Sequence, residues 1–187
     1  VLFGLWAIAW AGTLTNFTYS LDDYQADAVT TFRVNFMTES AVNNVDDFLL
    51  YAVLEPNNGF SFSGVTMTDV SVTIDWVTGT VSQVTTNDRA IDVRITDPVP
   101  SGSDVSIVAQ GVVNSEYPNN YDFLFIRTAN TLGQAIDEPA NIDSFEILPG
   151  TLTGVSLSLS SYTPWATNVT ATIQYTNDRV IPADRNV

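Results

Sequence analysis

The stretch Gly12-Thr-Leu-Thr-Asn-Phe-Thr-Tyr-Ser-Leu-Asp-Asp-Tyr-Gln-Ala-Asp-Ala28 occurs a second time, in altered form, as Gly150-Thr-Leu-Thr-Gly-Val-Ser-Leu-Ser-Leu-Ser-Ser-Tyr-Thr-Pro-Trp-Ala166. Eight of the 17 aligned positions are identical. Such self-similarity indicates that a chain is built from repeated structural units. The second copy begins 138 residues after the first and is followed by only 21 residues after Ala166, so it matches only the opening of the first.

With a gap of one residue, the alignment continues beyond these stretches. Val34 and Phe36 then match Ile173 and Tyr175. The sequence therefore predicts three parts: an apolar segment over 1–12, a complete module over 13–149 and an incomplete second module over 150–187.

Apolar and polar residues alternate with a period of two in many short segments after residue 12. In one of them, Val70, Val72, Ile74 and Trp76 alternate with polar residues, which predicts one buried face. The same alternation occurs over 32–36, 91–95, 122–127, 155–159 and 169–175. Clusters of Pro, Gly and Asn separate the segments, and none shows a capped helical pattern. Many short strands at this spacing predict an all-β fold, a β-sandwich.

The composition excludes most familiar catalytic chemistry. Among 187 residues there are 21 acidic and six basic residues, all six of them Arg, with no His and no Cys. A Ser-His-Asp triad, a thiol nucleophile, a Schiff-base lysine and a zinc site of the usual ligands are therefore impossible. A net charge of −15 argues against binding to nucleic acid. We expect no enzyme activity and no cofactor.

The first twelve residues are almost entirely apolar, and no charge occurs before Asp22. Twelve residues are too few to span a bilayer, so no membrane span is expected. Ala9-Trp10-Ala11 resembles a signal-peptidase site, which makes a leftover signal peptide one interpretation. A strand that is apolar on both faces and buried is the other.

The two unusual ends of the sequence suggest a common explanation. An incomplete module would leave apolar side chains uncovered, and the N-terminal segment has such side chains to spare. We therefore predict that residues 1–12 of one copy insert as a donor strand into the second module of a neighbouring copy, forming a homopolymer. The predicted donor side chains are Val1, Leu2, Phe3, Leu5, Trp6, Ile8 and Trp10. The predicted acceptor side chains are Val169, Ile173, Tyr175 and Ile181. Insertion into the same chain, and continuation in a longer tandem chain, are the alternatives.

A family resemblance points the same way. Gly150-Thr-Leu-Thr, Leu159-Ser-Ser, Ala166 and Val180-Ile-Pro-Ala resemble the opening of immunoglobulin-like repeats in large secreted surface proteins of microbes. The resemblance implies an immunoglobulin-like β-sandwich with a structural role at the cell surface. By mechanism, the predicted assembly is similar to chaperone–usher pili and donor-strand archaeal filaments.

An adhesive or carbohydrate-binding surface module is the alternative function. It would need aromatic side chains exposed in loops, for which Tyr117, Tyr121 and Trp165 are the candidates.

Two further kinds of site are indicated by short motifs. Asn16-Phe-Thr and Asn168-Val-Thr are acceptor sequences for N-linked glycans in a secreted protein. Asp46, Asp47, Asp137 and Asp143 lie in acidic clusters whose oxygens suit a structural calcium ion, although none has the spacing of an EF-hand. Solvated acidic loops are the favoured interpretation of these clusters.

Overall fold

The computed structural model describes residues 11–42, 48–50, 60–87, 90–121, 126–130, 132–139 and 143–177, with the backbone alone at 48–50. The predicted all-β fold is confirmed, because the only helical element in these residues is the 3-10 turn Met67–Asp69. None of the described segments forms a helix with the length and apolar character needed to cross a membrane.

Fourteen strands are described. They are β1 (Gly12–Leu21), β2 (Val29–Met37), β3 (Phe48–Leu50), β4 (Val70–Ile74), β5 (Val77–Gly79), β6 (Val81–Thr86), β7 (Ile91–Ile95), β8 (Asp104–Val113), β9 (Asn119–Tyr121), β10 (Thr128–Ala129), β11 (Ala135–Pro139), β12 (Phe145–Ile147), β13 (Leu152–Leu159) and β14 (Ala171–Asn177).

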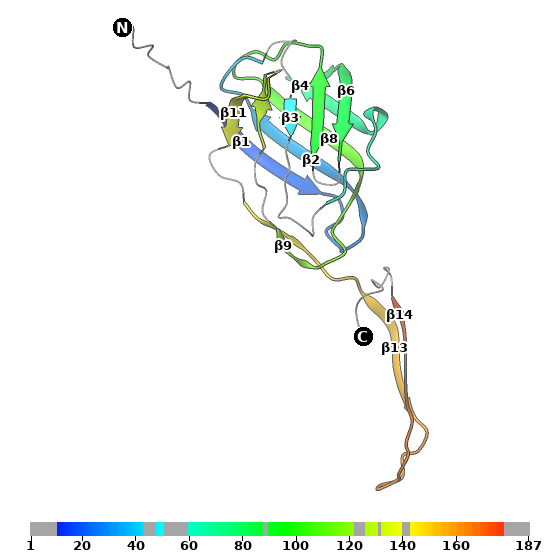
Figure 1. The fold of residues 1–187 in the computed structure, drawn as a ribbon. Coiled ribbons are helices and arrows are strands. Elements are labelled where there is room, and N and C mark those ends of the chain that lie inside the picture. The colour runs from blue at the N-terminus through cyan, green and yellow to red at the C-terminus, as the bar shows by residue number, and fades with distance from the viewer. Residues whose placement is uncertain are drawn as a thin grey trace, which may run out of the picture.

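These strands form four sheets (Figure 1). The largest has seven strands in the order β10-β11-β1-β2-β8-β4-β5, and a second has three in the order β3-β7-β6. β9 pairs with β12, and β13 pairs with β14. The alternation seen in the sequence turns one face of the seven-stranded sheet inward, where the three-stranded sheet packs against it.

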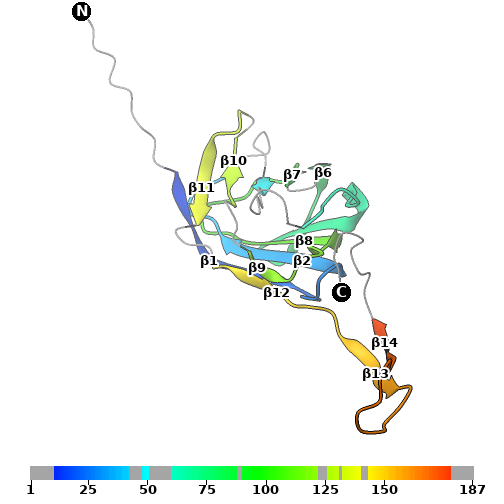
Figure 2. The ribbon, with the colours of Figure 1, turned by 60° about the horizontal axis from the view of Figure 1, so that its bottom comes forward.

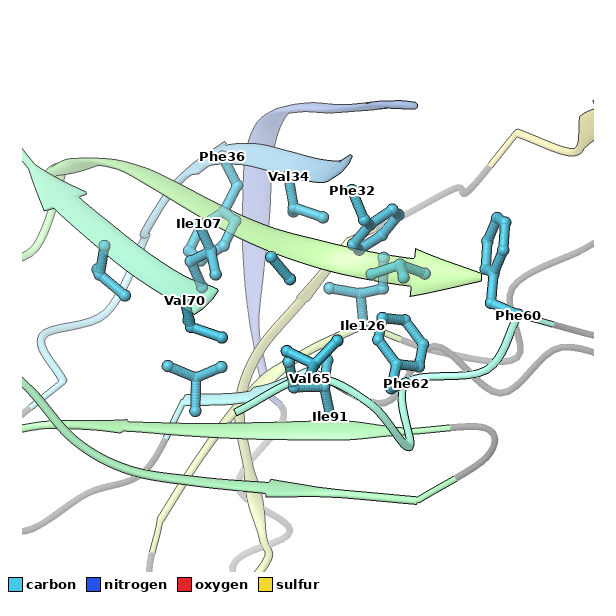
Figure 3. Packing of buried hydrophobic residues seen from close by; sticks show 14 of the residues in the cluster. Phe32, Val34, Phe36, Phe60, Phe62, Val65, Val70, Ile91, Ile107 and Ile126 are labelled. Atoms are coloured by element: carbon cyan, nitrogen blue, oxygen red, sulfur yellow. The ribbon is translucent and has the colours of Figure 1, made fainter. Parts of the chain in front are cut away.

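The core lies between these two sheets (Figure 3). Phe32 and Val34 of β2 and Ile107 of β8 enter it from one side, and Ile91 of β7 enters from the other. The ring of Phe32 lies 6.0 Å from that of Phe60 and 5.9 Å from that of Phe62, between ring centroids. Because every one of these side chains is buried, this part of the chain has a core of its own.

β1 changes its partner along its length. Residues 12–14 pair in parallel with β11, and residues 15–21 pair in antiparallel with β2. The register shifts between Thr15 and Thr18, where Asn16 has φ +50°. This β-bulge lets one strand join β11 and β2 in one sheet.

The structure corrects the prediction for Trp76. Its alternation with Val70, Val72 and Ile74 predicted a buried position, but β4 ends at Ile74 and the ring of Trp76 is 90% exposed. Ile74 pairs with Val77, so Asp75 and Trp76 form a two-residue hairpin turn. Their φ angles are +47° and +69°, as a type I′ turn requires. The chain reverses direction before the alternation can place Trp76 in the core.

Trp76→Gly should raise the free energy of unfolding by about 1 kcal/mol, because glycine adopts a positive φ without strain. Part of the relief is offset by the greater freedom of glycine in the unfolded chain. Urea unfolding followed by circular dichroism measures the change. Trp76→Ala is the control, since it removes the ring and keeps a Cβ at the strained position. A glycine variant that unfolds at a lower urea concentration than the alanine variant contradicts the prediction.

Candidate functional site

The hairpin formed by β13 and β14 stands apart from the two packed sheets. Figures 1 and 2 show it extending away from them beyond β12. Its two strands pair only with each other, and no other described strand is hydrogen-bonded to either edge. Isolated two-stranded hairpins are marginally stable in water, so this hairpin is the part of the described chain that most needs a partner.

The pairing of the hairpin reproduces that of β1 with β2. Tyr19 pairs with Val34 in the first hairpin, and the aligned residues Leu157 and Ile173 pair in the second. All five residue pairs between β1 and β2 recur in this way between aligned residues. The register shift between Thr15 and Thr18 recurs between the aligned Thr153 and Ser156. The sequence repeat is therefore also a structural repeat.

The two hairpins also have positive φ angles at the same aligned positions. Asn16 has φ +50° and its counterpart Gly154 has φ +60°. Asp27 has φ +59° and its counterpart Trp165 has φ +66°. Positive φ values are uncommon outside glycine, so their recurrence at aligned positions indicates one shared local fold.

Local hydrogen bonds recur as well. The Leu21 amide donates to the Tyr24 hydroxyl at 3.2 Å, and the Leu159 amide donates to the Tyr162 hydroxyl at 3.4 Å. Beyond each tyrosine, the Ala28 amide donates to the Gln25 carbonyl and the Ala166 amide to the Thr163 carbonyl, both at 3.2 Å. The repeated tyrosine, Tyr24 in one copy and Tyr162 in the other, thus accepts the same hydrogen bond from the end of the preceding strand.

The two copies differ in what covers them. Val34 is fully buried, whereas its counterpart Ile173 is 64% exposed. Leu14 is 3% exposed, whereas Leu152 is 52% exposed. The strand alternation places the remaining apolar side chains on the same open face, namely Val155, Leu157, Leu159, Ala171 and Tyr175. We call these seven residues the open face.

The open face carries apolar side chains that a partner could bury. Burying a Val, Leu or Ile side chain contributes about 1.5–3 kcal/mol, so Leu152, Val155, Leu157 and Ile173 together offer roughly 6–12 kcal/mol before the costs of association. Residues 150–177 also contain no charged side chain. In a chain of net charge −15, this hairpin is a surface that a second copy can approach without repulsion from the hairpin itself.

The first hairpin carries an ion pair that its copy lacks. Arg33 lies 3.0 Å from Asp22, and this hydrogen bond lowers the pKa of the Asp22 carboxyl. The aligned positions hold Ser160 and Thr172, which are neutral. Asp23 and Asp27 of the first hairpin align with Ser161 and Trp165, so the second hairpin has no charged residue at any of these positions.

The predicted acceptor residues fall on this hairpin where they are described. Ile173 and Tyr175 lie on β14, and Val169 precedes it and is 38% exposed. Ile181 lies outside the described residues. So do the seven predicted donor residues from Val1 to Trp10.

The predicted glycan acceptors and the acidic residue Asp137 lie as follows. Asn16 and Asn168 are exposed, as a glycan acceptor must be. Asp137 is buried in β11 and accepts hydrogen bonds from the amides of Glu39 and Ser40 at 3.1 and 3.0 Å.

Among the described residues, the acidic clusters do not form a calcium site. Asp143 is exposed, and its carbonyl accepts a hydrogen bond from the Tyr19 hydroxyl. Within the described ranges, no three acidic side chains are grouped as a metal site. Asp46 and Asp47 lie outside those ranges.

Of the aromatic candidates for ligand stacking, Tyr121 is buried and Trp165 is exposed. Tyr121 is buried, and its hydroxyl contacts the Ser115 hydroxyl and the Tyr117 carbonyl, so the expectation of an exposed ring there is wrong. Trp165 is 98% exposed at the end of the hairpin. Trp76, which the sequence placed in the core, is exposed as well.

No family model, curated protein or solved structure matches this chain.

Proposed function

We propose that this chain is a structural subunit of an extracellular filament, built from immunoglobulin-like β-sandwich modules and joined head to tail by strand donation. The observation that carries the proposal is the second hairpin, which has the pairing of β1 and β2 but which no other described strand covers. Residues 1–12 of a neighbouring copy would supply the missing cover.

The first module indicates what a completed hairpin needs. There, β8 pairs along the edge of β2 from Val29 to Met37. The same edge of β14 has no partner among the described strands. A donated strand gains main-chain hydrogen bonds along this edge, and alternate side chains pack on the open face. The N-terminal segment is apolar at both alternating sets of positions, which suits this place.

The length of the N-terminal segment favours donation to a second copy over insertion into the hairpin of the same chain. β1 begins at Gly12, at the end of the seven-stranded sheet away from the hairpin (Figure 1). Ten strand residues extend about 33 Å, and eleven fully extended residues reach about 40 Å at most. Running back along β1 therefore uses most of the reach of residues 1–11 before they could pair along β13 or β14.

The energy of such a contact suits a lasting assembly. Seven large apolar side chains in residues 1–10 contribute roughly 10–20 kcal/mol of gross burial, from which ordering the strand and docking the subunit subtract several kcal/mol. Donor and acceptor are different surfaces, so each copy can bind one neighbour at each end, and the contact propagates unless it closes into a ring.

The repeat itself favours one second candidate, a tandem-module protein in which a further stretch of the same polypeptide covers the open face. In that case residues 1–12 would not bind the hairpin.

The test compares the 187-residue chain with a chain lacking residues 1–11, by light scattering after size exclusion and by negative-stain microscopy. We expect filaments or large oligomers from the first and folded single subunits from the second. A labelled peptide of residues 1–12 should bind the shortened chain. Monomers from both chains, together with no binding of the peptide, would overturn strand donation and leave the tandem candidate.

A further inference from the structure

The outer face of the seven-stranded sheet carries a row of short polar side chains. Thr18 pairs with Asn35, Asn35 pairs with Ser106, and Ser106 pairs with Thr73. Thr73 in turn pairs with Thr78 on β5. Directly paired residues lie on the same face, and neighbouring strands are about 4.8 Å apart, so the row crosses five strands at regular spacing. We call it the polar row.

The middle of the polar row, at Asn35, Ser106 and Thr73, lines a shallow hollow with a volume of about 390 Å³. The residues around it are Asn16, Asn35, Phe36, Thr73, Trp76, Asp104, Val105 and Ser106. Amides and hydroxyls, which both donate and accept hydrogen bonds, therefore lie beside one broad aromatic ring.

The turn that carries Trp76 is fixed to the start of β8 by two hydrogen bonds. The Asp75 amide donates to the Asp104 carbonyl at 2.9 Å, and the Asp104 amide donates to the Asp75 carboxylate at 2.9 Å. The turn therefore cannot swing away from the start of β8. A tryptophan with φ +69° is strained where glycine is not, and its ring gains no burial in return. Departures from local rules of this kind are typical of functional sites.

We propose that the hollow and the polar row bind a neutral saccharide chain. The apolar face of a sugar ring stacks on Trp76, and its hydroxyls form hydrogen bonds with Asn35, Thr73 and Ser106. The Asp104 carboxylate beside them accepts from further hydroxyls and repels anionic polymers, as does the net charge of −15.

Two sources of such a saccharide fit the hollow. Asn16 lies at its edge and belongs to an acceptor sequence for N-linked glycans, so a glycan attached there is within reach of the ring. A saccharide of the surroundings has the same chemistry. The experiment separates the two sources.

The first arm uses the full chain made without glycans, titrated with cellohexaose and with chitohexaose and followed by calorimetry and tryptophan fluorescence. We expect binding of at least one oligosaccharide. Trp76→Ala should weaken that binding about tenfold or more, as loss of a central aromatic contact does. Ser106→Ala should weaken it several-fold. Trp165→Ala is the matched control, because it removes an equally exposed ring elsewhere and should change the affinity less than twofold.

The second arm uses the chain made with a glycan on Asn16, beside Asn16→Gln. Protection of Trp76 from oxidation by N-bromosuccinimide, present with the glycan and absent in Asn16→Gln, assigns the saccharide to the chain itself. Binding in the first arm that is lost in Trp76→Ala assigns it to an external glycan. Oligosaccharide binding that Trp76→Ala leaves unchanged overturns the proposal, and so does the absence of both binding and protection.

Discussion

Val34→Asp should unfold the chain, whereas Ile173→Asp should leave it folded and abolish its assembly. The two residues occupy the same position of the repeated hairpin, Val34 on β2 and Ile173 on β14. Val34 is fully buried, and an unpaired charge there costs several kcal/mol, which exceeds what a marginally stable domain tolerates. Ile173 is mostly exposed, so the free chain hydrates the new carboxylate.

Circular dichroism measures folding of the two variants, and light scattering measures their assembly. In the Ile173→Asp chain the sheets around Phe32 should unfold at an unchanged temperature, and the labelled peptide of residues 1–12 should no longer bind. Ile173→Leu is the matched control and should assemble as the unaltered chain does. If Ile173→Asp assembles normally, the open face is not the acceptor. If Val34→Asp stays folded, the buried position assigned to it is wrong.

Gly12→Ala should lower the free energy of unfolding by about 3 kcal/mol. A Cβ at this position would clash with Oδ1 of Asp137 and would crowd the Ser40 hydroxyl at 2.8 Å. Asp137 is fully buried and holds the Glu39 and Ser40 amides, so moving its carboxylate breaks hydrogen bonds that nothing else replaces. Overpacking of 1–3 kcal/mol and the loss of buried hydrogen bonds act in the same direction.

Chemical denaturation of Gly12→Ala and Gly64→Ala makes the comparison. At Gly64 the nearest atom to an added Cβ is the Gly111 carbonyl oxygen at 4.0 Å, so alanine fits there and should change stability by less than about 1 kcal/mol. Equal stability of the two variants contradicts the close contact of β1 with β11.

Much of the fold follows from local pattern. The alternation over 32–36 and 91–95 predicted strands that the structure has as β2 and β7, because a period of two matches the pleat of a half-buried sheet. The repeat over 150–166 predicted a second module that opens as the first does. The two copies share one local backbone there, although Tyr162 and Ala166 are the only residues of the turn that are identical to their counterparts. The repeated sequence reproduces two local features, the hydrogen bond from the Leu159 amide to the Tyr162 hydroxyl and the bulge at Gly154.

Elsewhere the pattern was insufficient. Trp76 continues an alternation that the turn at Asp75 interrupts, and Tyr121 has the composition of an exposed loop around it yet packs into the core. The polar row could not be recognised in advance, because Thr18, Asn35, Ser106 and Thr73 come from four strands whose registers are set by pairing. No spacing in the sequence connects them.

The sequence by itself determined the all-β class, the absence of His, Cys and Lys chemistry, and the duplication of the first hairpin, since each depends on composition or on neighbours along the chain. The sequence also predicted that the second copy is uncovered, and only the tertiary structure decided which strands cover the first. Val34 and Ile173 are equivalent in sequence and in local pairing, and they differ because β8 and the sheet containing β7 pack around one and not around the other. Burial is a property of contacts between distant segments, so two copies of one local fold can have opposite surroundings.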